Sequence, residues 1–162
     1  MFGKTEGTAV EQSAMEGDRG GFVINGVSNY DRSGYSVSSA GDVNGDGFDD
    51  LIIWARGDDP NCYYSGASFV VFGKADGTAI ELSAIEDNTN TGGFVINGVS
   101  QDDQSGFSVS SAGDVNGDGF DDLIIGARGD DPNDGYSGAS FVVFGKADGT
   151  SVELSAIEAG TG

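Results

Sequence analysis

The chain has no histidine, one cysteine (Cys62) and two prolines among its 162 residues. Because imidazole is absent, the commonest general base is missing and Cys62 has no histidine to activate it as a nucleophile. A single cysteine excludes a disulfide within the chain, so the cysteine count says nothing about the redox compartment. No stretch is long and apolar enough to span a bilayer as a helix.

Positive charge is also scarce, with 7 Lys and Arg against 27 Asp and Glu and a net charge of −20. Nucleic acids and anionic membrane surfaces are themselves negative, so the sequence predicts that neither is a partner. A solvated surface suited to salt water is a second interpretation of the same acidity, and both interpretations are compatible. Met1–Lys4 runs straight into polar sequence, which predicts no secretory signal and leaves open a removed leader or a longer parent chain.

What the chain does contain is glycine, at 29 positions, and an internal repeat. The nonapeptide Asp42–Asp50 recurs unchanged at Asp114–Asp122, and residues 21–86 and 93–158 differ at nine positions. We therefore divide the chain into a remnant of a preceding repeat (1–20), a first repeat (21–92) and a second repeat (93–162).

Each repeat predicts four short strands, which in the first repeat are Ser33–Gly41, Asp50–Ala55, Ala67–Phe72 and Gly93–Val99. The segment Ala79–Ile85 is compatible with a short helical turn or with an extra strand. One four-stranded sheet cannot bury both faces, so it must stack on copies of itself in a propeller or pair with a second sheet in a sandwich. Near-identical units favour the propeller, an all-β fold.

The nonapeptide sets acidic or amide oxygens at positions one, three, five and nine, with glycine at six, a spacing that suits a hard divalent cation. Calcium is favoured over magnesium, which prefers fewer protein ligands and more water. We expect about two calcium ions per chain in a structural role, with a main-chain carbonyl contributed by the Phe of each loop. The expected ligands are Asp42, Asn44, Asp46, Phe48 and Asp50 in one loop, and Asp114, Asn116, Asp118, Phe120 and Asp122 in the other.

Three other interpretations of this loop were weighed. An EF-hand or dockerin loop needs an acidic ligand at position twelve, where this chain has Ile53 and Ile125. A calcium β-roll needs consecutive glycine-rich nonapeptides, whereas these loops start 72 residues apart. Asp-Asn-Gly runs also form ordinary turns, but two copies in the same context favour a metal site.

The pattern Ser-Gly-Tyr-Ser-Val, then Gly-Asp-Val-Asn-Gly-Asp-Gly-Phe-Asp-Asp-Leu-Ile-Ile, then Phe-Val-Val-Phe-Gly-Lys resembles FG-GAP repeats, the blades of integrin α-chain propellers and of bacterial and cyanobacterial repeat proteins. The resemblance implies four-stranded blades with calcium between the first and second strands. The family's Gly-Ala-Pro stands here as Trp54-Ala55-Arg56 and Gly126-Ala127-Arg128, which affects the following turn and not the metal loop.

Family propellers usually have seven blades, and this chain has material for two. Residues 34–100 make one complete blade, 106–145 lack a fourth strand, and 21–28 is a fourth strand without a blade. Unpaired edges require a partner, so we expect strand 21–28 of one chain to complete blade 106–145 of another. Trimers or tetramers would then close rings of six or eight blades. A fragment of a longer propeller and an engineered sequence are the alternatives.

Most differences between the repeats fall on the rim opposite the calcium loops, where Tyr30, Trp54 and Tyr63 suggest an aromatic patch for a protein or sugar ligand. Local packing of Trp54 is the competing interpretation. The two Arg-Gly-Asp tripeptides suggest an integrin ligand only weakly. We expect a non-catalytic binding or adhesion module, extracellular or at the cell surface; the alternatives are a purely structural assembly unit and, less favoured, a hydrolase using paired carboxylates.

Overall fold

The computed structural model describes residues 20–58, 63–89, 92–132, 135 and 137–161. Residues 1–19, which cover nearly all of the expected remnant, and Cys62 lie outside this part of the chain. The described residues form mainly β-strands, with two short helices. The all-β prediction is therefore confirmed.

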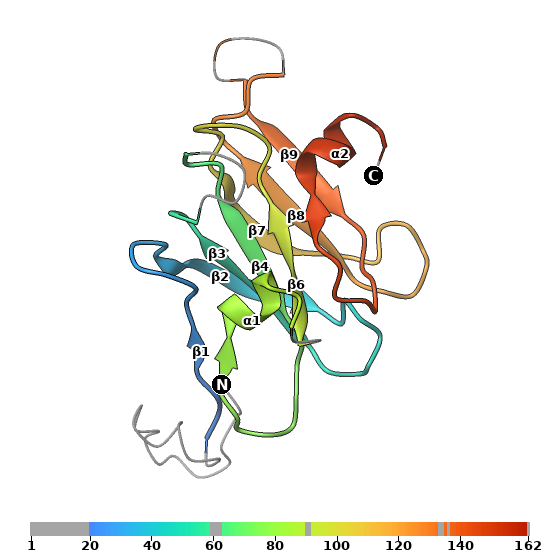
Figure 1. Ribbon diagram of the computed structural model, residues 1–162. Coiled ribbons are helices and arrows are strands. Elements are labelled where there is room, and N and C mark those ends of the chain that lie inside the picture. The colour runs from blue at the N-terminus through green and yellow to red at the C-terminus, as the bar shows by residue number, and fades with distance from the viewer. Residues whose placement is uncertain (1–19, 59–62, 90–91, 133–134, 136, 162) are drawn as a thin grey trace, which may run out of the picture.

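The first sheet contains a complete antiparallel blade (Figure 1). Its strands follow one another in space as β2 (Ser33–Gly41), β3 (Asp50–Ala55), β4 (Ala67–Val71) and β6 (Gly93–Asn97). Strand β4 is continuously buried, as its unbroken apolar sequence predicts for a strand covered on both faces. All four predicted strands of this blade are present, with the last two slightly shorter than expected.

The second sheet repeats the first three strands of that blade. Its strands are β7 (Ser105–Gly113), β8 (Asp122–Ala127) and β9 (Ala139–Val143), and within the described residues β9 pairs only with β8. Strand β7 lies against β2, β3 and β4, so the second blade stacks on the first. This is the arrangement of neighbouring propeller blades.

The segment Ala79–Ile85, for which the sequence left open a helical turn or an extra strand, contains both. Strand β5 (Ile80–Glu81) leads into α1 (Leu82–Glu86) and pairs in parallel with β1 (Ile24–Asn25). The second repeat forms the same motif from β10 (Val152–Glu153) and α2 (Leu154–Glu158), with β10 parallel to β6.

Strand β1 occupies the position that β6 occupies one repeat later. Ile24 lies opposite Ile80 as Ile96 lies opposite Val152, a shift of one repeat. Whereas β6 also pairs with β4, β1 has no second strand beside it among the described residues. That missing ladder explains why only two residues of the expected strand 21–28 are paired as a β-strand.

Two apolar cores follow from this stacking. One lies between the blades and joins Ile52, Val70 and Phe72 of the first repeat to Val109, Leu123 and Ile125 of the second. The other lies on the opposite face of the first blade and packs Phe69, Val71 and Ile53 against β5, α1 and the partly buried Phe22 and Ile24. The rest of that face has no blade packed on it in the described residues.

Candidate metal loops and the opposite rim

The first metal loop joins β2 to β3 and is organised around the Asp42 carboxylate. Its Oδ1 accepts hydrogen bonds from the amides of Gly45 (2.8 Å) and Asp46 (3.1 Å), and its Oδ2 accepts one from Gly47 (3.0 Å). Gly47 has φ +88°, the left-handed conformation expected at position six. The loop backbone is thereby wrapped around a single carboxylate.

The other predicted ligands extend this frame. Asn44 Oδ1 accepts the Asp46 amide at 2.8 Å, and Asp46 Oδ1 accepts the Phe48 amide at 2.9 Å. The side chains of Asn44 and Asp46 also meet through an Nδ2 to Oδ2 hydrogen bond of 2.9 Å. Three predicted ligands, Asp42, Asn44 and Asp46, therefore lie together, while the Phe48 carbonyl remains an expected ligand.

Asp50 closes the loop from beneath, at the start of β3. Its side chain is fully buried and accepts amide hydrogen bonds from Val43 at 2.8 Å and from Gly73 at 2.7 Å. Burial raises the pKa of the Asp50 carboxyl to about 6; these hydrogen bonds lower it, and the negative charges of Asp46 and Asp42 raise it. The other two carboxylates of the loop therefore contribute to the raised pKa of Asp50.

The second loop reproduces the first. Asp114 accepts the amides of Gly117, Asp118 and Gly119 at 2.7, 3.1 and 3.0 Å. The remaining predicted ligands, Asn116, Asp118, Phe120 and Asp122, repeat the contacts of the first loop, and Asp122 is likewise buried. The same sequence thus gives the same frame in two blades.

The two loops also contact each other, which their separation in sequence does not suggest. The Asp42 amide donates to Asp121 Oδ2 at 2.9 Å, and the Asp121 amide donates to the Asp42 carbonyl at 3.0 Å. The Phe120 ring lies against Gly45, where a Cβ would come within 2.5 Å of the ring. Asp121, at position eight of the second loop, is therefore hydrogen-bonded to Asp42, at position one of the first loop.

Within the described residues, no three acidic side chains converge in an arrangement that holds a metal ion. The frame nevertheless fits a hard cation in its chemistry. Its side-chain donors are carboxylate and amide oxygens, and calcium binds such oxygens together with main-chain carbonyls. Asp42 Oδ2 and Asp46 Oδ1 each accept one amide hydrogen bond and retain a further lone pair.

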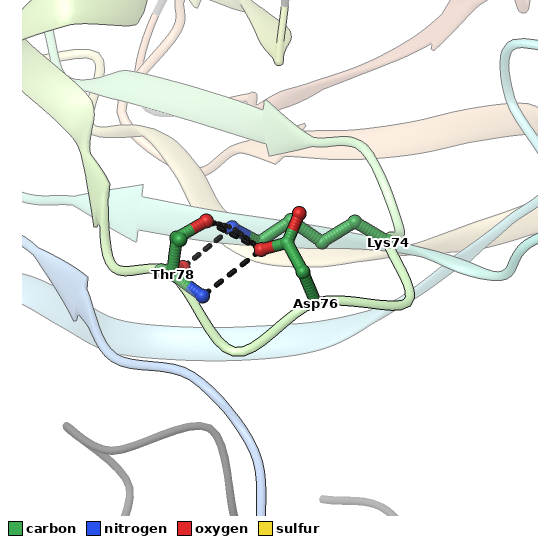
Figure 2. A network of polar contacts seen from close by, with 3 residues as sticks. All are labelled: Lys74, Asp76 and Thr78. Carbon is green, nitrogen blue, oxygen red and sulfur yellow. Dashed lines mark hydrogen bonds and ion pairs between the residues drawn. The ribbon is translucent and has the colours of Figure 1, made fainter.

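A second polar loop follows β4 in each blade. Lys74 Nζ reaches the carbonyl and hydroxyl of Thr78 and lies 2.9 Å from Asp76, as Figure 2 shows. Hydrogen bonds from Thr78 and Lys74 lower the pKa of the Asp76 carboxyl to about 2. The ammonium also lies 5.1 Å from the Phe22 ring centroid, so this clasp ties the first blade to the chain that precedes it.

The second repeat has the same clasp at Lys146, Asp148 and Thr150, with Lys146 Nζ 4.7 Å from the Phe94 ring centroid. Phe94 belongs to β6, the fourth strand of the first blade. The clasps therefore hold Phe22 and Phe94 in equivalent places, one blade apart.

The three aromatic residues predicted for the opposite rim separate into two groups. Trp54 is completely buried, between the rings of Tyr35 (5.4 Å) and Phe107 (5.8 Å), and does not present a surface to a ligand. Tyr30 and Tyr63 are exposed. They line one hollow of about 280 Å³ together with Arg32, Arg56, Gly57 and Tyr64.

The sequence did not identify the two arginines of this hollow as candidate ligand residues. Arg32 differs from Gln104 in the second repeat, which was the available signal. Arg56 lies 5.6 Å from the rings of both Tyr35 and Tyr64. The Arg-Gly-Asp tripeptides share this rim, but the aspartates Asp58 and Asp130 are buried.

Comparison with known proteins identifies the repeats. The FG-GAP repeat family matches residues 33–71 and 105–143, the first three strands of each blade. The chain is 32% identical over 102 residues to integrin alpha pat-2 of Caenorhabditis elegans, an alignment that covers 63% of this chain and 8% of that protein. It is also 32% identical over 125 residues to integrin alpha-5 of Xenopus laevis (74% and 11%), and 28% identical over 107 residues to mouse integrin alpha-IIb (66% and 9%).

The stacked blades with their strand-connecting acidic loops define a β-propeller-type repeat protein. The chain contains two FG-GAP repeats, and they are similar to those of integrin α chains. It spans about a tenth of the length of these relatives. In the part of the chain that the structure describes, no helix has the length and apolar character of a membrane span.

Proposed function

We propose that the chain is a calcium-binding, integrin-like propeller module that binds a protein or glycan ligand outside the cell or at its surface and has no catalytic activity. The observation that supports calcium most strongly is the pair of matching frames around Asp42 and Asp114. Each frame gathers carboxylate and amide oxygens around one turn, the donor set that calcium prefers. The integrin relatives support the adhesive role, and the absence of histidine argues against a hydrolase.

Each loop would hold one calcium ion, giving about two per chain. In the first loop Asp42, Asn44, Asp46 and Asp50 would supply side-chain oxygens, and Phe48 its carbonyl. The bound ion would offset the repulsion among the three carboxylates. Its role is structural, because it would brace the turn between the two inner strands of each blade.

Calcium titration tests this proposal. We expect isothermal titration calorimetry to give two calcium ions per chain, and Asp46→Ala to reduce the number to one. Asp76→Ala is the control, since it removes an exposed carboxylate outside the metal loops. No calcium uptake by the unaltered chain, or an unchanged stoichiometry in Asp46→Ala, would refute the assignment.

For the ligand, the hollow lined by Tyr30 and Tyr63 is the best-supported surface on the opposite rim. The second repeat supplies matched replacements, because Tyr30→Asp and Tyr63→Gly install the residues that this repeat carries at the same positions. Asp102 already adopts φ +66°, close to the +76° of Tyr30. Binding to a panel of glycans and matrix proteins should be lost in this double variant, and retention of the bound ligand would place its site elsewhere.

A second candidate function is self-assembly, favoured by the edges of β9 and β1 that have no partner strand among the described residues. Strand 21–28 of one chain would complete the blade at 106–145 of another, and trimers or tetramers would close rings of six or eight blades. Native mass in calcium tests it, with a mass of one chain as the contrary result.

A further inference from the structure

Most exposed large apolar side chains in the described part of the chain gather on the two outer faces of the blade pair. They are eight of the eleven such residues. The front face, on the first blade, is defined by Tyr35, Val37, Phe48 and Leu51. The back face, on the second blade, is defined by Val115, Ile124, Val142 and Phe144.

Every back-face residue is the repeat equivalent of a residue in the joint between the two blades. The exposed fraction rises from 0% at Val43 to 59% at Val115, and from 9% at Phe72 to 55% at Phe144. Ile52 and Val70 are buried in the joint, and their equivalents, Ile124 and Val142, are exposed. The back face is thus a copy of the surface that the first blade offers to the second, and no described residue forms a further blade on it.

The front face repeats the other half of the joint. Val109 is 8% exposed between the blades, whereas its equivalent, Val37, is 65% exposed. Leu123 is fully buried there, whereas Leu51 is exposed. The chain therefore carries one complete joint and the two separate halves of another.

A hollow on the front face matches a side chain on the back face. Within the joint, the Val43 carbonyl and Phe120 both lie beside Gly145, and the Val43 side chain is fully buried. The equivalent place beside Gly73 and Phe48 is part of a hollow of about 590 Å³. Val115, the equivalent of Val43, stands exposed on the back face.

The polar contact of the joint is duplicated as well. Asp121 exchanges hydrogen bonds with the Asp42 backbone, and its carboxylate lies against Gly41. Asp49, the equivalent of Asp121, is exposed on the front side. On the back side, a Cβ at Gly113 would meet no atom within 4 Å, whereas at Gly41 it would meet Asp121.

The edge strands β1 and β9 lie where the same pairing of front and back faces would bring them together. Strand β1 is fixed to the first blade by its pairing with β5 and by a 2.6 Å hydrogen bond from Asn25 to Glu81, which matches that from Asn97 to Glu153. It lies in the position of a fourth strand. Shifting the β4–β6 register by one repeat places Gly21 opposite Val143 and Asn25 opposite Ala139.

We propose that a second copy of this chain docks its front face on the back face in a head-to-tail joint that reproduces the internal one. Val115 enters the front-face hollow of the second copy, whose Asp49 bonds the Asp114 backbone and whose β1 pairs with β9. The inference gives the assembly candidate its surfaces and does not depend on calcium binding or on a rim ligand. Such a contact closes into a ring or continues as a filament. The net charge of −20 opposes it, so added salt should strengthen it.

Paired face variants test the proposal with the whole chain. Val37→Asp removes the front face and Phe144→Asp removes the back face, and both side chains are more than half exposed, so each monomer should fold. Each variant alone should be monomeric by light scattering at concentrations where the unaltered chain associates. An equimolar mixture should form dimers and nothing larger, because one intact joint remains.

Asp49→Ala separates this joint from general apolar adhesion. It should weaken association at least tenfold, although it lowers the negative charge, and loss of charge alone would favour association. Circular dichroism should show that all three variants remain folded. Variants are compared with calcium and with EDTA, so that a chain that binds no calcium but still gives the mixed dimer would refute the metal assignment and keep the joint.

The proposal would be overturned if the unaltered chain were monomeric in calcium and high salt at about 100 μM. It would also be overturned by association that survives both face substitutions in one chain, or by a mixture of single variants that stays monomeric.

Discussion

Asp42 and Asp121 hold each other through reciprocal hydrogen bonds, 2.9 Å from the Asp42 amide to the Asp121 carboxylate and 3.0 Å from the Asp121 amide to the Asp42 carbonyl. The two residues are 79 positions apart and belong to metal loops of different blades. The conformation of the second loop is therefore coupled to that of Asp42, the first residue of the first loop.

Asp121→Ala should lower the free energy of unfolding by about 1.5–3 kcal/mol, the usual contribution of a hydrogen bond to a charged group. Urea unfolding at fixed calcium measures it. Asp49→Ala is the matched control, because Asp49 has the same loop position but no loop before it in the described residues. In dilute solution that control should change stability by less than about 0.5 kcal/mol. Equal effects of the two substitutions would contradict the coupling.

Calcium binding to the first loop should depend on pH around the pKa of Asp50. Burial raises this pKa to about 6 in the metal-free protein, above its ordinary value of 3.8, and a cation requires the ionised carboxylate. The folded, metal-free protein therefore binds a proton more tightly than the unfolded chain. Asp50 contributes stability that is fully present below about pH 4 and is lost as pH rises through about 6.

Calcium affinity of this loop should accordingly fall about tenfold per pH unit below pH 6, with a proton released on binding. Calorimetry in buffers of different ionisation enthalpy at pH 5.5 detects that proton. Asp50→Asn is the control, since it cannot release one. A binding enthalpy that is independent of the buffer would rule out this linkage.

Trp54→Gly should destabilise the fold and not act as a selective binding variant. Removing a fully buried indole from between Tyr35 and Phe107 should cost about 3–5 kcal/mol, seen as a lower urea midpoint. Tyr63→Gly, on the exposed rim, should cost much less. A Trp54→Gly chain as stable as the unaltered one would mean that this ring does not support the joint.

Thr78→Val should raise the pKa of Asp76 from about 2 toward 3.8, because the Thr78 hydroxyl is the largest cause of its depression. The clasp contributes stability above about pH 4 that is lost as pH falls through 2, and this substitution should move the loss to higher pH. Carboxyl carbon chemical shifts follow the titration, and Thr150→Val should affect Asp148 in the same way. An Asp76 titration near pH 2 in Thr78→Val would disprove the role of the hydroxyl.

Local patterns were sufficient to predict the strands, and the metal ligands stay a prediction. Ser33–Gly41 and Asp50–Ala55 have the predicted bounds because glycine and acidic turns bracket them. The amide hydrogen bonds around Asp42 were not predicted, because the sequence analysis considered this side chain only as a cation ligand. The repeat period also predicted that the second blade lacks a fourth strand, and none is paired to β9 in the part of the chain that the structure describes.

The contacts between blades could not be predicted from the sequence. The bond from Asp121 to Asp42 depends on how two loops approach in space, and both loops have identical letters. Trp54 differs from Gly126 at a single position, and only the packing of Tyr35 and Phe107 shows that the ring is buried. The division of Ala79–Ile85 into β5 and α1 depends on Ile24 pairing with Ile80, a contact between distant segments.

Native mass spectrometry of the 162-residue chain in millimolar calcium tests the central claim most directly, because one spectrum counts both ions and chains. The account predicts two calcium ions per chain, and assemblies of several chains that lose their ions in EDTA. A spectrum of single chains without bound calcium, with the same unfolding temperature in EDTA, would contradict it.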